Sequence, residues 1–147
     1  MTLENLIGKG LDSEPANRVE IKRLLDKIVT KLADAEVESI SLETRFDIAY
    51  EALLQIGLVA LRSHHLRPNS RGGHHAIALQ SLPLTIGYPR ENVRLLDEFR
   101  KQRAAGLYDG SFSLSESELR ELLTATIEVY TLLQGWLEKN QSTWSEK

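Results

Sequence analysis

Apolar residues recur along most of this chain at intervals of three and four positions, the spacing that lines one face of an α-helix. The alternation of apolar and polar residues that is typical of a β-strand never holds for more than a few positions. The pattern therefore predicts an all-α fold, an up-and-down helical bundle of about five helices. We assign the bundle to residues 15–140, an N-terminal arm or short helix to residues 1–14, and a C-terminal tail to residues 141–147.

Local signals place the first two helices. We expect the first long helix to start near Ser13, with Pro15 in its first turn, and to end before a connection at residues 36–41. Residues 42–63 form a second helix that is apolar nearly all round, which is typical of a helix buried on most sides. A loop with proline, asparagine, serine and two glycines follows at residues 65–73.

The later helices have their own boundary signals. A short helix is expected over residues 74–82, where Pro83 stops it, and a fourth helix over residues 90–107. Ser115 and Glu118 form a capping box, which marks the start of the last helix.

The fourth helix carries two arginines, Arg100 and Arg103, within its apolar stripe. A buried guanidinium without a partner is costly, so both need a counter-charge. Asp47 and Glu51 are candidates because they share a polar line with Gln55 on the otherwise apolar second helix. Two interpretations stay open: buried salt bridges between the two helices, or a cleft or subunit interface where the arginines face a phosphate. Both can hold, since an acid can orient an arginine that also contacts a ligand.

Composition narrows the class of protein. The 147 residues are 41% hydrophobic and 27% charged, the balance of an ordinary soluble domain. A net charge of −3 argues against general, charge-driven binding of nucleic acid, so any such contact must be local. The chain has no cysteine, no signal-peptide pattern and no apolar run long enough for a bilayer, and we expect a cytoplasmic protein without a membrane partner.

Charge is distributed unevenly along the chain. Between Glu51 and Glu91 no acidic residue occurs. The basic residues of this segment are Arg62, Arg67, Arg71, Arg90 and all four histidines. A second basic cluster follows directly, with Arg94, Arg100, Lys101 and Arg103 ahead of Tyr108. A basic band on an acidic protein predicts an anion site for phosphate, a nucleotide or the RNA backbone.

The histidines form two adjacent pairs, His64–His65 and His74–His75. Neighbours on a helix point about 100° apart, so neither pair chelates a metal well from one helix, and we expect no metal site and no cofactor. Gly72 and Gly73 precede the second pair and can open a helix N-terminus at which His74, His75 and free backbone N–H groups face an anion. The alternative is that the histidines are solvated loop residues or make capping contacts.

Four segments resemble bacterial HEPN-domain proteins: Arg45 to Ala52, Arg67-Pro68, Gly73-His74-His75, and Arg100 to Asp109. The likeness covers about residues 15 to 140. It implies a small helical bundle that forms a homodimer. Many members of the family are metal-independent ribonucleases of toxin–antitoxin or defence systems, often encoded beside a nucleotidyltransferase, and two motifs meet across the dimer at one RNA site.

The family motif is an arginine followed, after a short polar spacer, by a histidine. Arg103 matches the arginine, Ala104 stands where asparagine is common, and Tyr108 falls at the histidine position. The resemblance implies catalytic roles for Arg103, Arg100 and Tyr108, with the RNA 2′-hydroxyl as nucleophile. Because an unperturbed tyrosine has a pKa near 10, Tyr108 is a poor base at neutral pH.

Other residues are expected to bind or orient the substrate, namely Asp47, Glu51, Arg67, Arg71, His74 and His75. The expected function is RNA or nucleotide binding, with metal-independent endoribonuclease activity where catalysis survives the change at Tyr108. One alternative is a non-catalytic HEPN module that binds a nucleotidyltransferase, an antitoxin or another protein partner. The other is a structural helical dimer.

Overall fold

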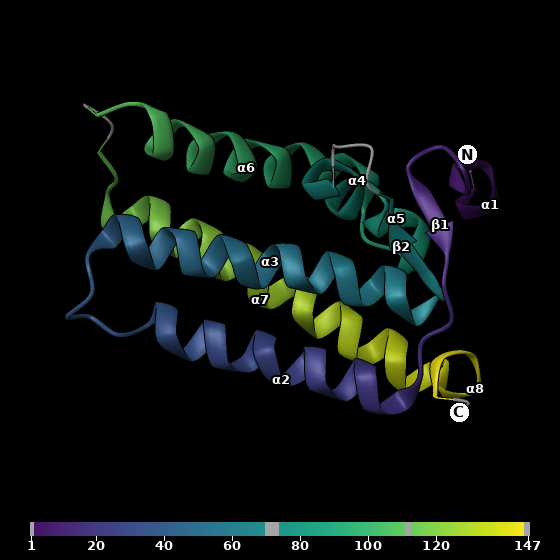
Figure 1. The fold of residues 1–147 in the computed structure, drawn as a ribbon. Helices are drawn as coiled ribbons and strands as arrows, with labels where there is room; N and C mark the ends of the chain where they lie inside the picture. Colours follow the sequence, from purple (N-terminus) through teal and green to yellow (C-terminus); the bar gives the residue numbers. More distant parts are fainter. Residues whose placement is uncertain (1, 70–73, 111–112, 146–147) are drawn as a thin grey trace.

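The structure is a computed structural model that describes residues 2–69, 74–110 and 113–145. Helices dominate these residues, which confirms the predicted all-α bundle (Figure 1). The long helices among them are α2 (Arg18–Ala35), α3 (Leu42–Ser63), α6 (Val93–Tyr108) and α7 (Glu116–Lys139). The shorter elements are α1 (Leu3–Leu6), β1 (Leu11–Ser13), β2 (Leu66–Pro68), α4 (His74–Gln80), α5 (Leu82–Thr85), the 3₁₀-helix η1 (Arg90–Asn92) and α8 (Gln141–Trp144).

Helix α3 is the centre of the bundle, as its apolar sequence predicts. In Figure 1 it lies between α2 and α6, and α7 passes behind it. Buried side chains from all four long helices form one core around it, including Ile28, Phe46, Leu53, Phe99 and Leu133. The short helix α4 also packs on α3 and contacts α6, so these three helices meet at one end of the core.

The first long helix begins later than the sequence predicts. Asn17 is its N-cap, and the Asn17 side chain accepts a hydrogen bond from the backbone N–H of Glu20 at 2.9 Å. Ser13, the predicted start, belongs instead to β1, which pairs antiparallel with β2 so that Ser13 lies opposite Leu66. The predicted helical start at Ser13 and the predicted loop at residues 65–73 are therefore both wrong over the strand residues.

Arg62, near the end of α3, explains why the chain before α2 is extended. Its guanidinium donates to the backbone carbonyls of Glu14 at 2.6 Å and Pro15 at 2.9 Å, and to the Leu66 carbonyl at 3.2 Å. It also binds the Glu20 carboxylate through two hydrogen bonds, at 2.7 and 3.0 Å. The carbonyls before Asn17 therefore have a donor from α3 and do not need a helix to satisfy them.

Two further boundaries differ from the predictions, and one agrees. Pro83 does not end helical structure, because it lies in the first turn of α5, where a missing N–H costs nothing. The expected C-terminal tail contains α8, whose buried Trp144 donates its ring N–H to the Leu137 carbonyl at 2.7 Å. The predicted capping box of Ser115 and Glu118 is present at the start of α7.

Candidate anion-binding site

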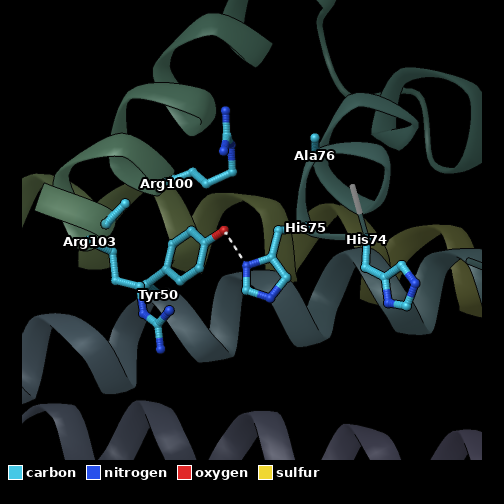
Figure 2. Close-up of a pocket in the computed structure, with 7 residues that line it drawn as sticks. Tyr50, His74, His75, Ala76, Arg100 and Arg103 are labelled. Atoms are coloured by element: carbon cyan, nitrogen blue, oxygen red, sulfur yellow. Dashed lines mark hydrogen bonds between the residues drawn. The ribbon is translucent and has the colours of Figure 1, made fainter. Parts of the chain in front are cut away.

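An open pocket lies where α3, α4 and α6 meet, and Figure 2 shows it in close-up. Its volume is about 240 Å³. Its lining residues are Tyr50 from α3, His74, His75 and Ala76 from α4, and Arg100, Arg103 and Ala104 from α6. Four of these seven side chains are basic and none is a carboxylate, so the wall of the pocket favours an anion.

Core packing fixes α6 against α3 at this place. Phe99, which precedes Arg100 in the sequence, is buried. Its ring packs edge to face on the ring of Phe46, with the ring centroids 6.4 Å apart. Because Phe99 is anchored in this way, Arg100 and Arg103 lie at the border between the core and solvent. Their side chains are 35% and 31% exposed, so the prediction that they lie inside a buried stripe is corrected to a position at its edge.

Tyr50 is the most buried group of the pocket, with no exposed surface. Its hydroxyl lies 3.3 Å from Nδ1 of His75, and the guanidinium carbon of Arg103 is 5.8 Å from the centre of its ring, within cation–π range. In Figure 2 the ring stands between the two arginines, with its hydroxyl directed at His75. Burial raises the pKa of Tyr50 to about 12, so the hydroxyl keeps its proton at neutral pH.

His75 is half-buried, and its surroundings oppose protonation. Burial lowers its pKa below the ordinary value, and the charges of Arg103, Arg100 and His74 lower it further. The ring is therefore neutral at pH 7, with one nitrogen carrying a proton and the other a lone pair.

The two arginines differ in how firmly they are held. Arg100 donates from Nε to Asp97 at 2.8 Å, and this hydrogen bond holds the pKa of Asp97 below its usual range. Arg103 lies 4.0 Å from Asp47 and 3.9 Å from Glu51, which are ion-pair distances too long for hydrogen bonds. The structure thus combines a loose salt bridge between α3 and α6 with an open pocket at the same arginine.

The two acids beside Arg103 are weak ion-pair partners for it. Burial raises the pKa of Asp47, and Arg103 only partly offsets this. Glu51 accepts a hydrogen bond from Lys31 at 3.0 Å, so its charge is shared between two cations. Within the part of the chain that the structure describes, Arg103 makes no hydrogen bond. Its N–H groups remain available to a ligand.

The pocket does not include every residue singled out from the sequence. Tyr108 ends α6 with 84% of its surface exposed and does not line the pocket. Arg67 lies in β2, where it pairs with Glu14 at 2.5 Å and Asp12 at 3.9 Å. Arg71 and the glycines expected to open α4 are outside the described residues. The structure therefore brings together Arg100, Arg103, His74 and His75, with Asp47 and Glu51 at ion-pair distance from Arg103.

Tyr50 is the functional candidate that the sequence argument missed. A tyrosine in an apolar helix reads as a core residue, and most of its ring is one. The available signal was its hydroxyl, which needs a polar partner when buried. Its place between Asp47 and Glu51 put that hydroxyl near the polar line of α3.

Three comparisons of this chain, with family models, with curated proteins and with solved structures, found no match. Over the described residues, no three histidine, aspartate or glutamate side chains gather in a way that could hold a metal ion. None of the helices in that part of the chain has both the length and the apolar character needed to cross a bilayer.

Proposed function

We propose that this chain binds RNA or a nucleotide through a phosphate group, at the pocket between α3, α4 and α6. The observation that carries the proposal is the pocket wall itself, where two guanidinium groups and two imidazoles converge without a carboxylate among the lining residues. Guanidinium groups match phosphate oxygens in charge and in the geometry of their N–H groups.

The state of Arg103 supports this proposal. A tightly bidentate salt bridge would have to break before a ligand could bind, but Arg103 is at 3.9 and 4.0 Å from its acids. A phosphate can replace these long contacts with short, charge-assisted hydrogen bonds, so little is lost on binding. The acid-free segment between Glu51 and Glu91 supplies the α4 side of the pocket, which keeps repulsion of an anion low there.

Cleavage of the bound RNA is the further step that the HEPN resemblance suggests. In that chemistry Arg100 and Arg103 would stabilise charge on the scissile phosphate while the 2′-hydroxyl loses its proton and bonds to phosphorus. The P–O5′ bond would break, leaving a 2′,3′-cyclic phosphate and a 5′-hydroxyl that takes up a proton. Tyr108, at the motif's histidine position, lies outside the pocket of its own chain. This position favours binding as the function of a single chain. The ribonuclease activity, the homodimer and a nucleotidyltransferase or antitoxin partner stay predictions.

The proposal is tested by titrating a short labelled single-stranded RNA and a labelled adenosine monophosphate at low salt, with fluorescence anisotropy as the signal. Arg103→Ala should weaken binding about tenfold or more, the loss expected for a hydrogen bond to a charged group. Arg94→Ala is the matched control, because it removes the same charge from an exposed position of the same helix. Its affinity should stay within about twofold of the parent, since no direct phosphate contact is lost.

Equal weakening in both variants would mean that binding reports overall charge and would refute the pocket. The same samples, incubated with EDTA and resolved on a denaturing gel, test cleavage. Products that disappear in Arg103→Ala would support the ribonuclease, and intact RNA would leave binding as the function.

A further inference from the structure

We propose that Tyr50 is a positioning residue that holds His75 with its proton on Nε2, so that His75 offers the phosphate a hydrogen-bond donor and does not act as a base through that nitrogen. This inference rests on the proposed function for its ligand. The protonation of the ring can nevertheless be measured without any ligand.

The Tyr50 hydroxyl needs a hydrogen-bond partner because it is buried. The residue is fully buried, and among the described residues the hydroxyl has one hydrogen-bond partner, Nδ1 of His75 at 3.3 Å. A buried hydroxyl that donates to nothing is unfavourable, because it has given up water without a replacement. Since a neutral imidazole has one lone pair, Nδ1 can accept from Tyr50 only if the ring proton is on Nε2.

The opposite arrangement fits less well. If Nδ1 carried the proton, it would donate to the Tyr50 oxygen and the hydroxyl proton would then lack an acceptor in the described chain. Deprotonating Tyr50 would remove that conflict, but burial raises its pKa to about 12. The hydroxyl therefore acts as the donor at neutral pH.

The charges around His75 point the same way. Arg100 and Arg103 face it from α6, His74 adjoins it on α4, and Tyr50 approaches it from α3. A second proton would place another positive charge beside the arginines, and Nδ1 would then donate to the Tyr50 oxygen and leave the hydroxyl proton without an acceptor in the described chain. The neutral ring with Nε2–H is thus the form that this pocket accommodates, and Nε2 has no partner within the described residues.

The tautomer can be read from long-range ¹H–¹⁵N correlations of the histidine ring nitrogens at pH 8. His65 is an internal reference, because its Nδ1 accepts from the Ala16 N–H at 3.0 Å and its Nε2 donates to the Thr143 carbonyl at 2.9 Å. The His75 spectrum should match this pattern and should change in Tyr50→Phe. A proton on Nδ1 of His75 in the parent protein would overturn the inference.

A double-mutant cycle then tests whether the two residues act together. His75→Ala should weaken binding of adenosine monophosphate about tenfold, and Tyr50→Phe should weaken it less, since it loosens the ring without removing it. The double variant should bind no more weakly than His75→Ala alone. Additive losses would show that Tyr50 does not act through His75.

Two further variants distinguish a hydrogen-bond donor at His75 from a base and from a general effect of substitution on α4. His75→Gln retains an N–H donor and should recover most of the affinity lost in His75→Ala, whereas a base could not be replaced in this way. Gln80→Ala, at an exposed position of α4 that does not line the pocket, should change affinity by less than about twofold. If the parent protein binds neither inorganic phosphate nor adenosine monophosphate, the proposed function fails, while the ring spectra still decide the role of Tyr50.

Discussion

Replacing Arg62 by methionine should destabilise the protein strongly, although the residue is far from the candidate site. The Arg62 side chain is 9% exposed and joins the end of α3 to the strand before α2. It makes five hydrogen bonds, three to backbone carbonyls and two to Glu20. Methionine keeps the apolar stem in place and removes all five, so the loss reports the polar contacts and not a cavity.

The magnitude follows from the burial of each partner. Three hydrogen bonds to carbonyls contribute about 1 kcal/mol each, because those acceptors lose their charged donor. The pair with Glu20 adds up to about 1 kcal/mol, since the Glu20 carboxylate is 36% exposed and can return to water. The total is about 4 kcal/mol, which for a chain of this size lowers the melting temperature by roughly 12 °C.

Arg67→Met is the matched control for this variant. Arg67 also pairs with Glu14, but its side chain is 45% exposed, so its removal should cost less than about 1 kcal/mol. Urea unfolding gives the global free energy, and amide exchange at Glu14, whose N–H donates to the His65 carbonyl at 2.9 Å, reports the strand itself. If Arg62→Met melts within about 2 °C of the parent, the account of the extended segment before α2 is wrong.

Other expectations concern pH, packing and assembly. Burial lowers the pKa of His64, so the native state binds a proton less readily than the unfolded chain, and the free energy of unfolding should fall as pH drops below about 6.5. The urea midpoint should therefore be lower at pH 5.5 than at pH 7.5, and this decrease should be smaller in His64→Gln. Gly57→Ala should destabilise the protein by about 1–3 kcal/mol, because its Cβ would lie 2.7 Å from the Ala78 carbonyl oxygen. Gly135→Ala, where a Cβ meets nothing within 4 Å, should stabilise α7 by up to about 1 kcal/mol, and thermal melts of both variants check this. The predicted homodimer should give twice the chain mass by light scattering at tens of micromolar, and a monomeric mass would contradict it.

The long helices could be predicted because their signals are local. The apolar pattern predicts one helix over residues 42–63, and α3 spans Leu42–Ser63. The start of α7 was likewise set by the capping box of Ser115 and Glu118, which needs only four residues to recognise. The residues of an apolar repeat and of a helix cap lie within the same segment whose structure they determine.

The N-terminal segment could not be predicted in the same way, because distant residues decide its conformation. Ser13 and Pro15 are good local signals for a helix start, yet Arg62 binds the carbonyls of this segment from more than 45 positions away. The strands β1 and β2 are three residues each, too short for an alternating pattern to stand out. Pairing across such a distance leaves no local trace.

The sequence predicts some residues of the candidate site but not how far they are buried. Arg100 and Arg103 stood out because arginine is unusual in an apolar stripe, and the structure places both at one pocket. They are less buried than periodicity predicts, since Leu107, an apolar residue one turn beyond Arg103 on the same face, is 67% exposed. Helical periodicity gives the direction of a side chain, but it does not show where the neighbouring helices stop covering it.

Tyr50 and Tyr108 differ in their position relative to the pocket, and this difference bears on whether binding or cleavage is the function. Tyr50 is buried, and its hydroxyl lies 3.3 Å from Nδ1 of His75 in the wall of the candidate pocket. Tyr108 lies four residues beyond Ala104, the last residue of α6 in that wall, and is 84% exposed. Four helical residues advance about 6 Å, which takes Tyr108 beyond the pocket of its own chain. The phosphate binding that we propose therefore uses residues of one chain, whereas proposed chemistry that places Tyr108 at this pocket would need a second copy to supply it.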